Sequence, residues 1–284
     1  METYEWALVL FTVLSQAAMG GFVLTLWLRL RNKDAAMDVV YRKVNLVLCA
    51  ISVVSLLASL FHLGRPMLAP YAIGNLGSSW LSREVLLAGG FVGLLVLSVL
   101  FEKSPSIRQV VDWLAALAGI GAVASMATVY AVTIIPAWQG VNTYVAFFGT
   151  AAFLGAALAA SLVLVFGSGK ESVAANLQLL IWVAVAAVVV QMVVLPFYLA
   201  GLAGGGAAGQ STAAMLAGEY GQVLILRWAL ALVGGLVPFL VAGRRLTAGQ
   251  VPAGLVYVAV AAVLVGEIVG RYLFYATGTP IGIG

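Results

Sequence analysis

Charged residues are scarce in this sequence. Only 8% of its 284 residues are Asp, Glu, Lys or Arg, against about 25% in a typical soluble domain. Because a soluble protein needs a charged surface, this shortage excludes a soluble globular fold. The 63% share of hydrophobic residues excludes intrinsic disorder. A mean hydropathy of +1.11 indicates a protein that lies in lipid.

Side chains that bind metals are equally scarce. The sequence contains one cysteine, Cys49, and one histidine, His62. One cysteine cannot form an intramolecular disulfide, and a cluster held by cysteine thiolates needs several of them. A single histidine likewise excludes a haem held by two histidines of this chain. The sequence therefore predicts no haem, iron–sulfur cluster or other metal centre in this chain.

Eight stretches are long and apolar enough to cross a membrane, which takes about 20 residues. They show no alternation of period two, so a β-barrel is not expected, and the 32 glycines suit close helix packing in lipid. We therefore predict an all-α, polytopic integral membrane protein, with residues 1–284 forming one membrane domain of eight transmembrane helices and with long loops at residues 63–81 and 201–220. The predicted helices cover residues 5–30, 40–62, 82–101, 108–131, 143–166, 174–200, 221–243 and 252–276.

Basic residues are shared unevenly between the two sides of the predicted membrane domain. Lys and Arg collect on the cytoplasmic side of membrane proteins, and here one side has ten of them and the other has four. We therefore predict a cytoplasmic (inner) membrane protein, bacterial or archaeal, with both termini on the outer (periplasmic) side. The net charge of +4 follows from this bias and gives no reason to expect a nucleic-acid partner. The predicted inner side has Arg29, Arg31, Lys33, Arg42, Lys43, Lys103, Arg108, Lys170, Arg244 and Arg245, and the outer side has Arg65, Arg83, Arg227 and Arg271.

Ionisable residues inside membrane spans cost about 2.5–3.5 kcal/mol each and are therefore candidates for function. Most of those in this sequence lie toward the predicted outer ends of the helices. Each has a simpler interpretation: an interfacial histidine, loop-end arginines, or a structural pair of Glu267 and Arg271 spaced i, i+4. Asp112, near the inner end of its helix, is expected to be a surface group. The candidates are His62, Arg65, Arg83, Glu84, Arg227, Glu267 and Arg271.

This set of residue types suits a lipid-soluble quinol. Oxidation of a quinol releases two protons and two electrons, and a histidine and a carboxylate can accept the protons. An arginine beside them can orient a quinone carbonyl. Because no redox centre is predicted in this chain, the electrons have to pass directly to a centre in a partner subunit. That partner is expected to dock on the face that carries the site.

Several motifs resemble a known family. Residues 62–67 (HLGRPM), 75–84 (NLGSSWLSRE) and 266–271 (GEIVGR) are the most specific, with further agreement in residues 11–22 and 129–138. Together they resemble the membrane anchor subunit (DmsC-like) of the dimethyl sulfoxide reductase family of molybdopterin oxidoreductase complexes. The sequence is also similar to the related polysulfide reductase (NrfD-like) anchors. The resemblance covers the full length and has the same number of helices.

The resemblance implies a function and partners. Such an anchor binds menaquinone or ubiquinone non-covalently and exchanges electrons between the quinone pool and a ferredoxin-like subunit with four [4Fe–4S] clusters. A catalytic subunit with molybdopterin guanine dinucleotide completes the complex. Its terminal substrate stays open: a sulfoxide, N-oxide, polysulfide, tetrathionate or sulfite. Two four-helix sub-bundles, residues 1–135 and 140–284, are also implied.

The resemblance further implies site residues. The family's quinol-site histidine falls on His62 and its essential glutamate on Glu84. Tyr130 is similar in placement to a tyrosine that hydrogen-bonds the quinone in polysulfide reductase anchors, although an interfacial tyrosine is the alternative. Arg65 departs from the small polar residue common at its position. Gln16 lies nearer the middle of its predicted helix.

Two other classes of protein stay open. A secondary transporter or proton-conducting protein predicts charges near the bilayer midplane and broken helices. Here the charges lie toward one surface, and Pro196 and Pro238 are the only prolines in the interior of predicted spans. A purely structural anchor needs no ionisable cluster. The cluster of His62, Glu84, Glu267 and arginines therefore favours the quinone-reactive anchor.

Overall fold

The computed structural model describes residues 3–32, 35–61, 66–167 and 170–282. Within these ranges every regular element is helical, and eight helical segments are long and apolar enough to span a membrane. This confirms the predicted all-α, polytopic membrane fold. The spans are α1 (Thr3–Arg31), α2 (Ala35–Leu60), α3 (Trp80–Leu100), α4 (Pro105–Ala131), α5 (Val141–Phe166), α6 (Lys170–Ala203), a composite seventh span, and α10 (Ala253–Ala276).

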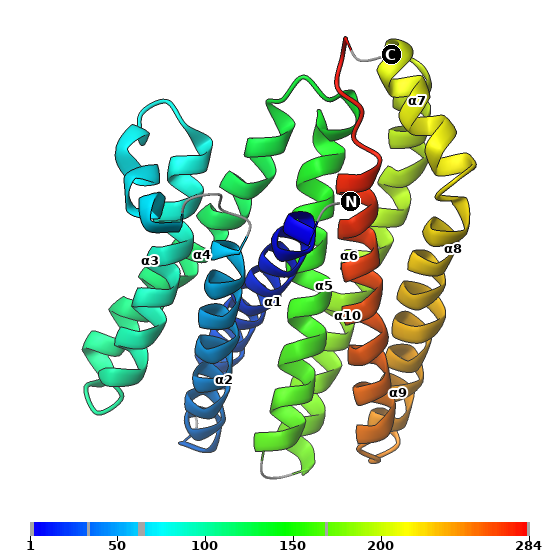
Figure 1. Cartoon of the computed structure of the whole chain (residues 1–284). Helices are drawn as coiled ribbons and strands as arrows, with labels where there is room; N and C mark the ends of the chain where they lie inside the picture. Colours follow the sequence, from blue (N-terminus) through cyan, green and yellow to red (C-terminus); the bar gives the residue numbers. More distant parts are fainter. Residues whose placement is uncertain (1–2, 33–34, 62–65, 168–169, 283–284) are drawn as a thin grey trace.

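Successive spans run in opposite directions, so the eight spans of the described residues bring the start of α1 and the end of α10 to the same side (Figure 1). We call this side, where α2, α4, α6 and α10 end, the terminal face; it is at the top of Figure 1. Helix α1 runs through the middle of the molecule and contacts α2, α4, α5 and α10. Because α1 contacts helices of both halves, the two predicted sub-bundles share an extensive boundary and stay a prediction.

The crossing of α1 and α5 is the tightest helix contact of the core. A Cβ atom added to Gly20 would lie 1.8 Å from the carbonyl oxygen of Ala151, and one added to Gly155 would lie 2.7 Å from the carbonyl carbon of Gly20. Only glycine permits such an approach, which is how helices associate in lipid without a hydrophobic driving force. The glycines therefore determine how closely the two halves of the protein pack.

Both long connections on the terminal face, which the sequence predicted as loops between spans, contain short helices. The first holds a 3-10 helix, η1 (Pro66–Asn75), and the second holds α7 (Gly206–Ala217). Helix α7 has an alanine-rich sequence with high helix propensity. At 12 residues it is too short to be predicted as a membrane span. It is fixed by Thr212, whose hydroxyl donates to the carbonyl of Thr277 at 2.8 Å, and by burial of Leu216.

The seventh span is not a regular α-helix. It consists of α8 (Gly221–Ala229), a π-helical segment (Leu230–Leu236) and α9 (Val237–Thr247). Gly234 and Gly235 lie against α10: an added Cβ would lie 2.5 Å from the Cβ of Ala262 and 2.7 Å from the Cγ2 of Val263, respectively. π-Helical turns occur frequently at functional sites, and this one directly follows the part of the span that carries Arg227.

Candidate functional site

The residues singled out in the sequence divide into three groups. His62 and Arg65 lie outside the described residues. Arg83 is engaged locally: its guanidinium donates to the carbonyls of Leu76 and Gly77, both at 2.8 Å, and stacks on the ring of Trp80 at 4.1 Å. Arg83 therefore secures the connection between η1 and α3. Glu84, Tyr130, Arg227, Glu267 and Arg271 point into the helix bundle.

Arg271 of α10 joins three helices at the centre of the bundle. Its Nη2 donates to the Oε1 of Gln16 from α1 at 2.8 Å and lies 3.5 Å from the Oγ1 of Thr150 from α5. The guanidinium also lies 3.7 Å from the ring centroid of Phe147. The side chains of Arg271 and Gln16 are almost fully buried. Gln16 therefore belongs to the site, although the sequence placed it apart from the main candidates.

Glu267 connects this centre with the seventh span. Its Oε2 accepts a hydrogen bond from Thr150 at 2.5 Å, and its Oε1 lies 3.6 Å from the Nη2 of Arg227. The same Nη2 donates to the Oε1 of Gln191 in α6 at 2.6 Å. The ion pair of Glu267 is thus made with Arg227 of α8, rather than with Arg271 four residues away. We call the connected set the central polar network: Gln16, Thr150, Gln191, Arg227, Glu267 and Arg271.

An aromatic cluster lies between this network and Glu84. The Tyr275 hydroxyl donates to the Tyr130 hydroxyl at 3.1 Å, and the Tyr130 ring contacts Trp138 and Phe274 with centroids 5.2 and 5.4 Å apart. Glu84 is 7% exposed, and its carboxylate is close enough to interact electrostatically with both tyrosine hydroxyls. Glu84 is therefore buried, and Tyr130 and Tyr275 are half-buried, in one region near the terminal face.

A cavity of about 110 Å³ opens beside the central polar network, between α5, α6, α8 and α10. Thr150, Gln191, Arg227, Glu267 and Arg271 line its polar end, and the other walls are largely leucine and aromatic side chains. An adjoining cavity of about 290 Å³ shares Asn142 and Tyr198 with it. In the part of the protein that the structure describes, no group of three or more His, Cys, Asp or Glu side chains is placed to hold a metal ion.

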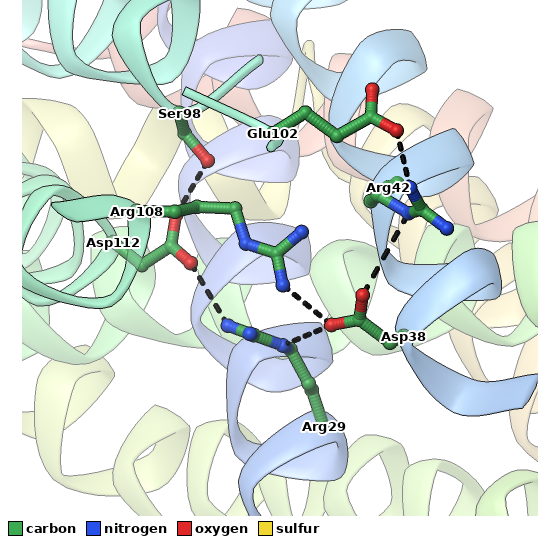
Figure 2. Close-up of polar contacts among 7 residues, drawn as sticks. All are labelled: Arg29, Asp38, Arg42, Ser98, Glu102, Arg108 and Asp112. Carbon is green, nitrogen blue, oxygen red and sulfur yellow. Dashed lines mark hydrogen bonds and ion pairs between the residues drawn. The ribbon is translucent and has the colours of Figure 1, made fainter. Parts of the chain in front are cut away.

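A second polar cluster joins the ends of α1 to α4 on the face opposite the terminal face (Figure 2). It corrects the expectation for Asp112, which is 0% exposed because three helices close over it. Its carboxylate accepts from Ser98 at 2.5 Å and pairs with Arg29 at 3.1 Å. Asp38 pairs with Arg29 at 2.8 Å. The cluster contains three positive and three negative charges. Its seven residues are Arg29, Asp38, Arg42, Ser98, Glu102, Arg108 and Asp112.

This cluster predicts a stability effect. Changing Ser98→Ala removes the hydroxyl that donates to the buried Asp112 carboxylate, and we expect the free energy of unfolding to fall by about 2 kcal/mol. Thermal unfolding of the purified protein in detergent measures the change. Ser161→Ala is the matched control, because Ser161 donates only to the carbonyl of Leu158 in its own helix. Equal midpoints for the two variants would contradict a stabilising role of the cluster.

Comparison with known proteins agrees with these observations. The family model described as the DMSO reductase anchor subunit (DmsC) matches residues 1–277. A protein of Escherichia coli K12 that is named as an anaerobic dimethyl sulfoxide reductase chain is 30% identical over 288 residues, which cover 99% of the present sequence and 97% of that protein. Its namesake in Haemophilus influenzae is 28% identical over 284 residues with the same coverage. A second E. coli protein, the anaerobic dimethyl sulfoxide reductase chain YnfH, is 32% identical over 165 residues, or 56% of the present sequence and 57% of that protein. The protein therefore belongs to the DMSO reductase anchor subunit (DmsC) family.

Proposed function

We propose that this protein is the quinone-reactive membrane anchor of a molybdenum oxidoreductase complex in anaerobic or sulfur respiration. The observation that carries the proposal is that Glu84, Tyr130 and Tyr275, from three helices, lie in one region near the terminal face, with the carboxylate buried and the two hydroxyls hydrogen-bonded to each other. A carboxylate inside a membrane span has a high cost, and that of Glu84 is buried among the helices. The grouping of these three residues next to Arg271 favours a binding site over a purely structural anchor.

The chemistry assigns a role to each group. When a quinol is oxidised, its two hydroxyl protons need acceptors and its two electrons leave through another centre. Glu84 accepts one proton and His62, which lies outside the described residues, accepts the other. The paired hydroxyls of Tyr130 and Tyr275 hydrogen-bond a ring oxygen, and Arg271 supplies positive charge behind them. Arg65, also outside the described residues, is proposed to contact the ring or the partner. The same groups serve the reverse reaction.

The electrons pass to partner subunits. The relatives are named as chains of anaerobic dimethyl sulfoxide reductase, and we propose the same kind of complex here. Its members are a ferredoxin-like iron–sulfur subunit with four [4Fe–4S] clusters and a catalytic subunit with molybdopterin guanine dinucleotide. The lipid-soluble carrier is menaquinone or ubiquinone. The iron–sulfur subunit docks on the terminal face, because electrons from a buried ring have to reach a cluster over a short distance.

The tyrosine pair provides a test of this function. In the purified complex, we expect Tyr275→Phe to lower quinol-linked turnover about tenfold, because the ring stays in the aromatic cluster and only the hydroxyl that positions Tyr130 is lost. Turnover with an artificial dye that donates to the partner subunits is the control and is expected to stay unchanged. Parallel loss of both activities would indicate a structural defect. Full quinol-linked turnover in the variant would argue against a role of the two tyrosines in quinone binding. Ion flux through the protein without quinone would favour a transporter.

The orientation in the membrane can be tested separately. Basic residues favour the face opposite the terminal face, so we propose that the terminal face and both termini are periplasmic. An alkaline phosphatase fusion after residue 282 is expected to be active, because that enzyme folds only outside the cytoplasm. A fluorescent-protein fusion at the same site, which matures in the cytoplasm, is expected to be dark. A bright fluorescent fusion would show that the C-terminal end lies in the cytoplasm, which contradicts the proposed orientation.

A further inference from the structure

The cavity beside the central polar network is separate from the place where Glu84 and the tyrosines meet. Arg227, Glu267 and Arg271 line it, whereas Glu84, Tyr130 and Tyr275 are not among its lining residues. Arg271 borders both places, because its guanidinium also interacts electrostatically with the two tyrosines. The cavity therefore offers a second binding place on the other side of the same arginine.

The hydrogen-bond acceptors at the polar end of this cavity are already engaged. Oε2 of Glu267 accepts from Thr150 and its Oε1 faces the Arg227 guanidinium. Oε1 of Gln191 accepts from Arg227. A ligand that donates hydrogen bonds there, such as a quinol with two hydroxyls, meets oxygens that each already have a donor, so it gains less than a ligand that accepts hydrogen bonds.

The donors at the same end are not all engaged. Nη1 of Arg271 and Nε1 of Trp228 are buried and have no hydrogen-bond partner, and both residues line the cavity. Buried polar groups are normally hydrogen-bonded, so each such exception requires an explanation. A ligand with acceptor oxygens and no donors would satisfy both nitrogens.

The position and the walls of the cavity limit the kind of ligand. Glu267 lies nine residues before Ala276, the last residue of α10, so its Cα lies about 13 Å from that helix end. A phosphate at this depth would be costly to bury, whereas a neutral carbonyl would not. Leu195, Leu224 and Phe274 form apolar walls that suit a flat ring. Val194, Phe197 and Leu202 of the adjoining cavity give room for an apolar tail.

We infer that this cavity is a second ring-binding site, in which Arg271 and Trp228 donate hydrogen bonds to the carbonyl oxygens of the oxidised quinone. The inference rests on the proposed function, since it takes the protein's lipid-soluble carrier to be a quinone. The two sites then differ in preference: the Glu84 site accepts protons from a quinol, and the cavity site donates to a quinone. A quinone formed at the first site has a neighbouring place to move to before it leaves.

Binding stoichiometry tests this inference. The probe is 2,3-dimethyl-1,4-naphthoquinone, oxidised or chemically reduced, in equilibrium dialysis against the purified complex in detergent. We expect two oxidised molecules to bind per wild-type complex, but only one reduced molecule. Ala146→Phe, which places a ring in the cavity that Ala146 lines, is expected to leave one oxidised molecule bound. Glu84→Gln is expected to retain the oxidised molecule in the cavity.

Two conservative substitutions test the same site with less risk that the variant protein fails to fold. Trp228→Phe removes the free indole donor and retains a ring, and we expect about fivefold weaker binding of the oxidised probe at one site. Trp113→Phe is the matched control, because Trp113 lies on the exposed surface of α4; no change is expected.

Three results would overturn the second site: one oxidised molecule per wild-type complex, unchanged stoichiometry in Ala146→Phe, or equal affinities for the two tryptophan variants. Loss of a bound phospholipid in Ala146→Phe, measured as phosphate, would assign the cavity to a lipid instead. Failure of the proposed function is distinguishable, since then neither form of the probe binds and quinol-linked turnover is unaffected by Glu84→Gln.

Discussion

Changing Glu84→Gln is expected to lower quinol-linked turnover of the complex at least about 100-fold, the usual contribution of a general acid or base. The glutamine has nearly the same shape, so it retains the packing of this buried residue of α3 and removes only the proton acceptor. Turnover with an artificial dye that donates to the partner subunits is expected to stay unchanged. The measurement is the ratio of the two activities in the purified complex.

Glu219→Gln is the matched control for this experiment. Glu219 is an exposed carboxylate in the turn between α7 and α8 on the same face, so the substitution removes an equal charge outside the site. Its quinol-linked turnover is expected to equal that of the wild type. If the Glu84 variant also kept quinol-linked turnover within about twofold of wild type, the proton acceptor would have to be another group.

Changing Gly20→Val is expected to destabilise the protein by about 3 kcal/mol or more, at the upper end of overpacking effects. The added Cβ would lie 1.8 Å from the Ala151 carbonyl oxygen of α5. Since a backbone atom cannot rotate away, α1 and α5 have to separate. Separation also moves Gln16 of α1 away from Arg271, so quinol-linked activity should fall together with the thermal midpoint in detergent.

Gly93→Val in α3 is the corresponding control. A Cβ added at Gly93 meets no heavy atom within 4 Å, so the same substitution there changes only the intrinsic helix propensity, by a small amount. We expect its thermal midpoint to stay close to that of the wild type. A similar loss of stability in both variants would show that the α1–α5 crossing tolerates separation and does not limit the fold.

The spans were predictable from the sequence because burial in lipid requires a continuous apolar run, and such a run is visible without any tertiary information. All eight predicted spans are present among the described residues. Helix α7 was missed because it is a segment of only 12 residues, for which the hydropathy gives no signal. The π-helical segment was missed because its residues, LALVGGL, have the composition of an ordinary span.

The site was predictable in part, for a different reason. Charged residues such as Glu267 and Arg271 stand out because their cost in a span is large, whereas the neutral Thr150 and Gln191 have a smaller cost and gave no signal. It was harder to predict which residues of the site pair with one another than to predict which residues belong to it. The spacing of Glu267 and Arg271 suggested a pair on one helix, but the ion pair crosses to Arg227, because pairing depends on how α8 packs on α10.

Asp112 shows the opposite failure. Its position near a helix end indicated an interfacial, solvated carboxylate. The structure buries it because Arg29 of α1 and Ser98 of α3 close over it, and those helix ends are far apart in the sequence. A signal was present in Arg108, which lies one turn before Asp112 on the same helix and pairs with Asp38 in the cluster.

The π-helical segment has a consequence for the phase of the seventh span. Each π turn holds an additional residue compared with an α turn, so the residues of α9 are displaced by about 100° from where an uninterrupted helix would put them. A helical-wheel drawing that treats Gly221–Thr247 as one regular helix therefore places the residues of α9 on the wrong side relative to those of α8. Removal of one residue between Leu230 and Leu236 would regularise the hydrogen bonding, while turning Arg227 away from Glu267 or Phe239 out of the core.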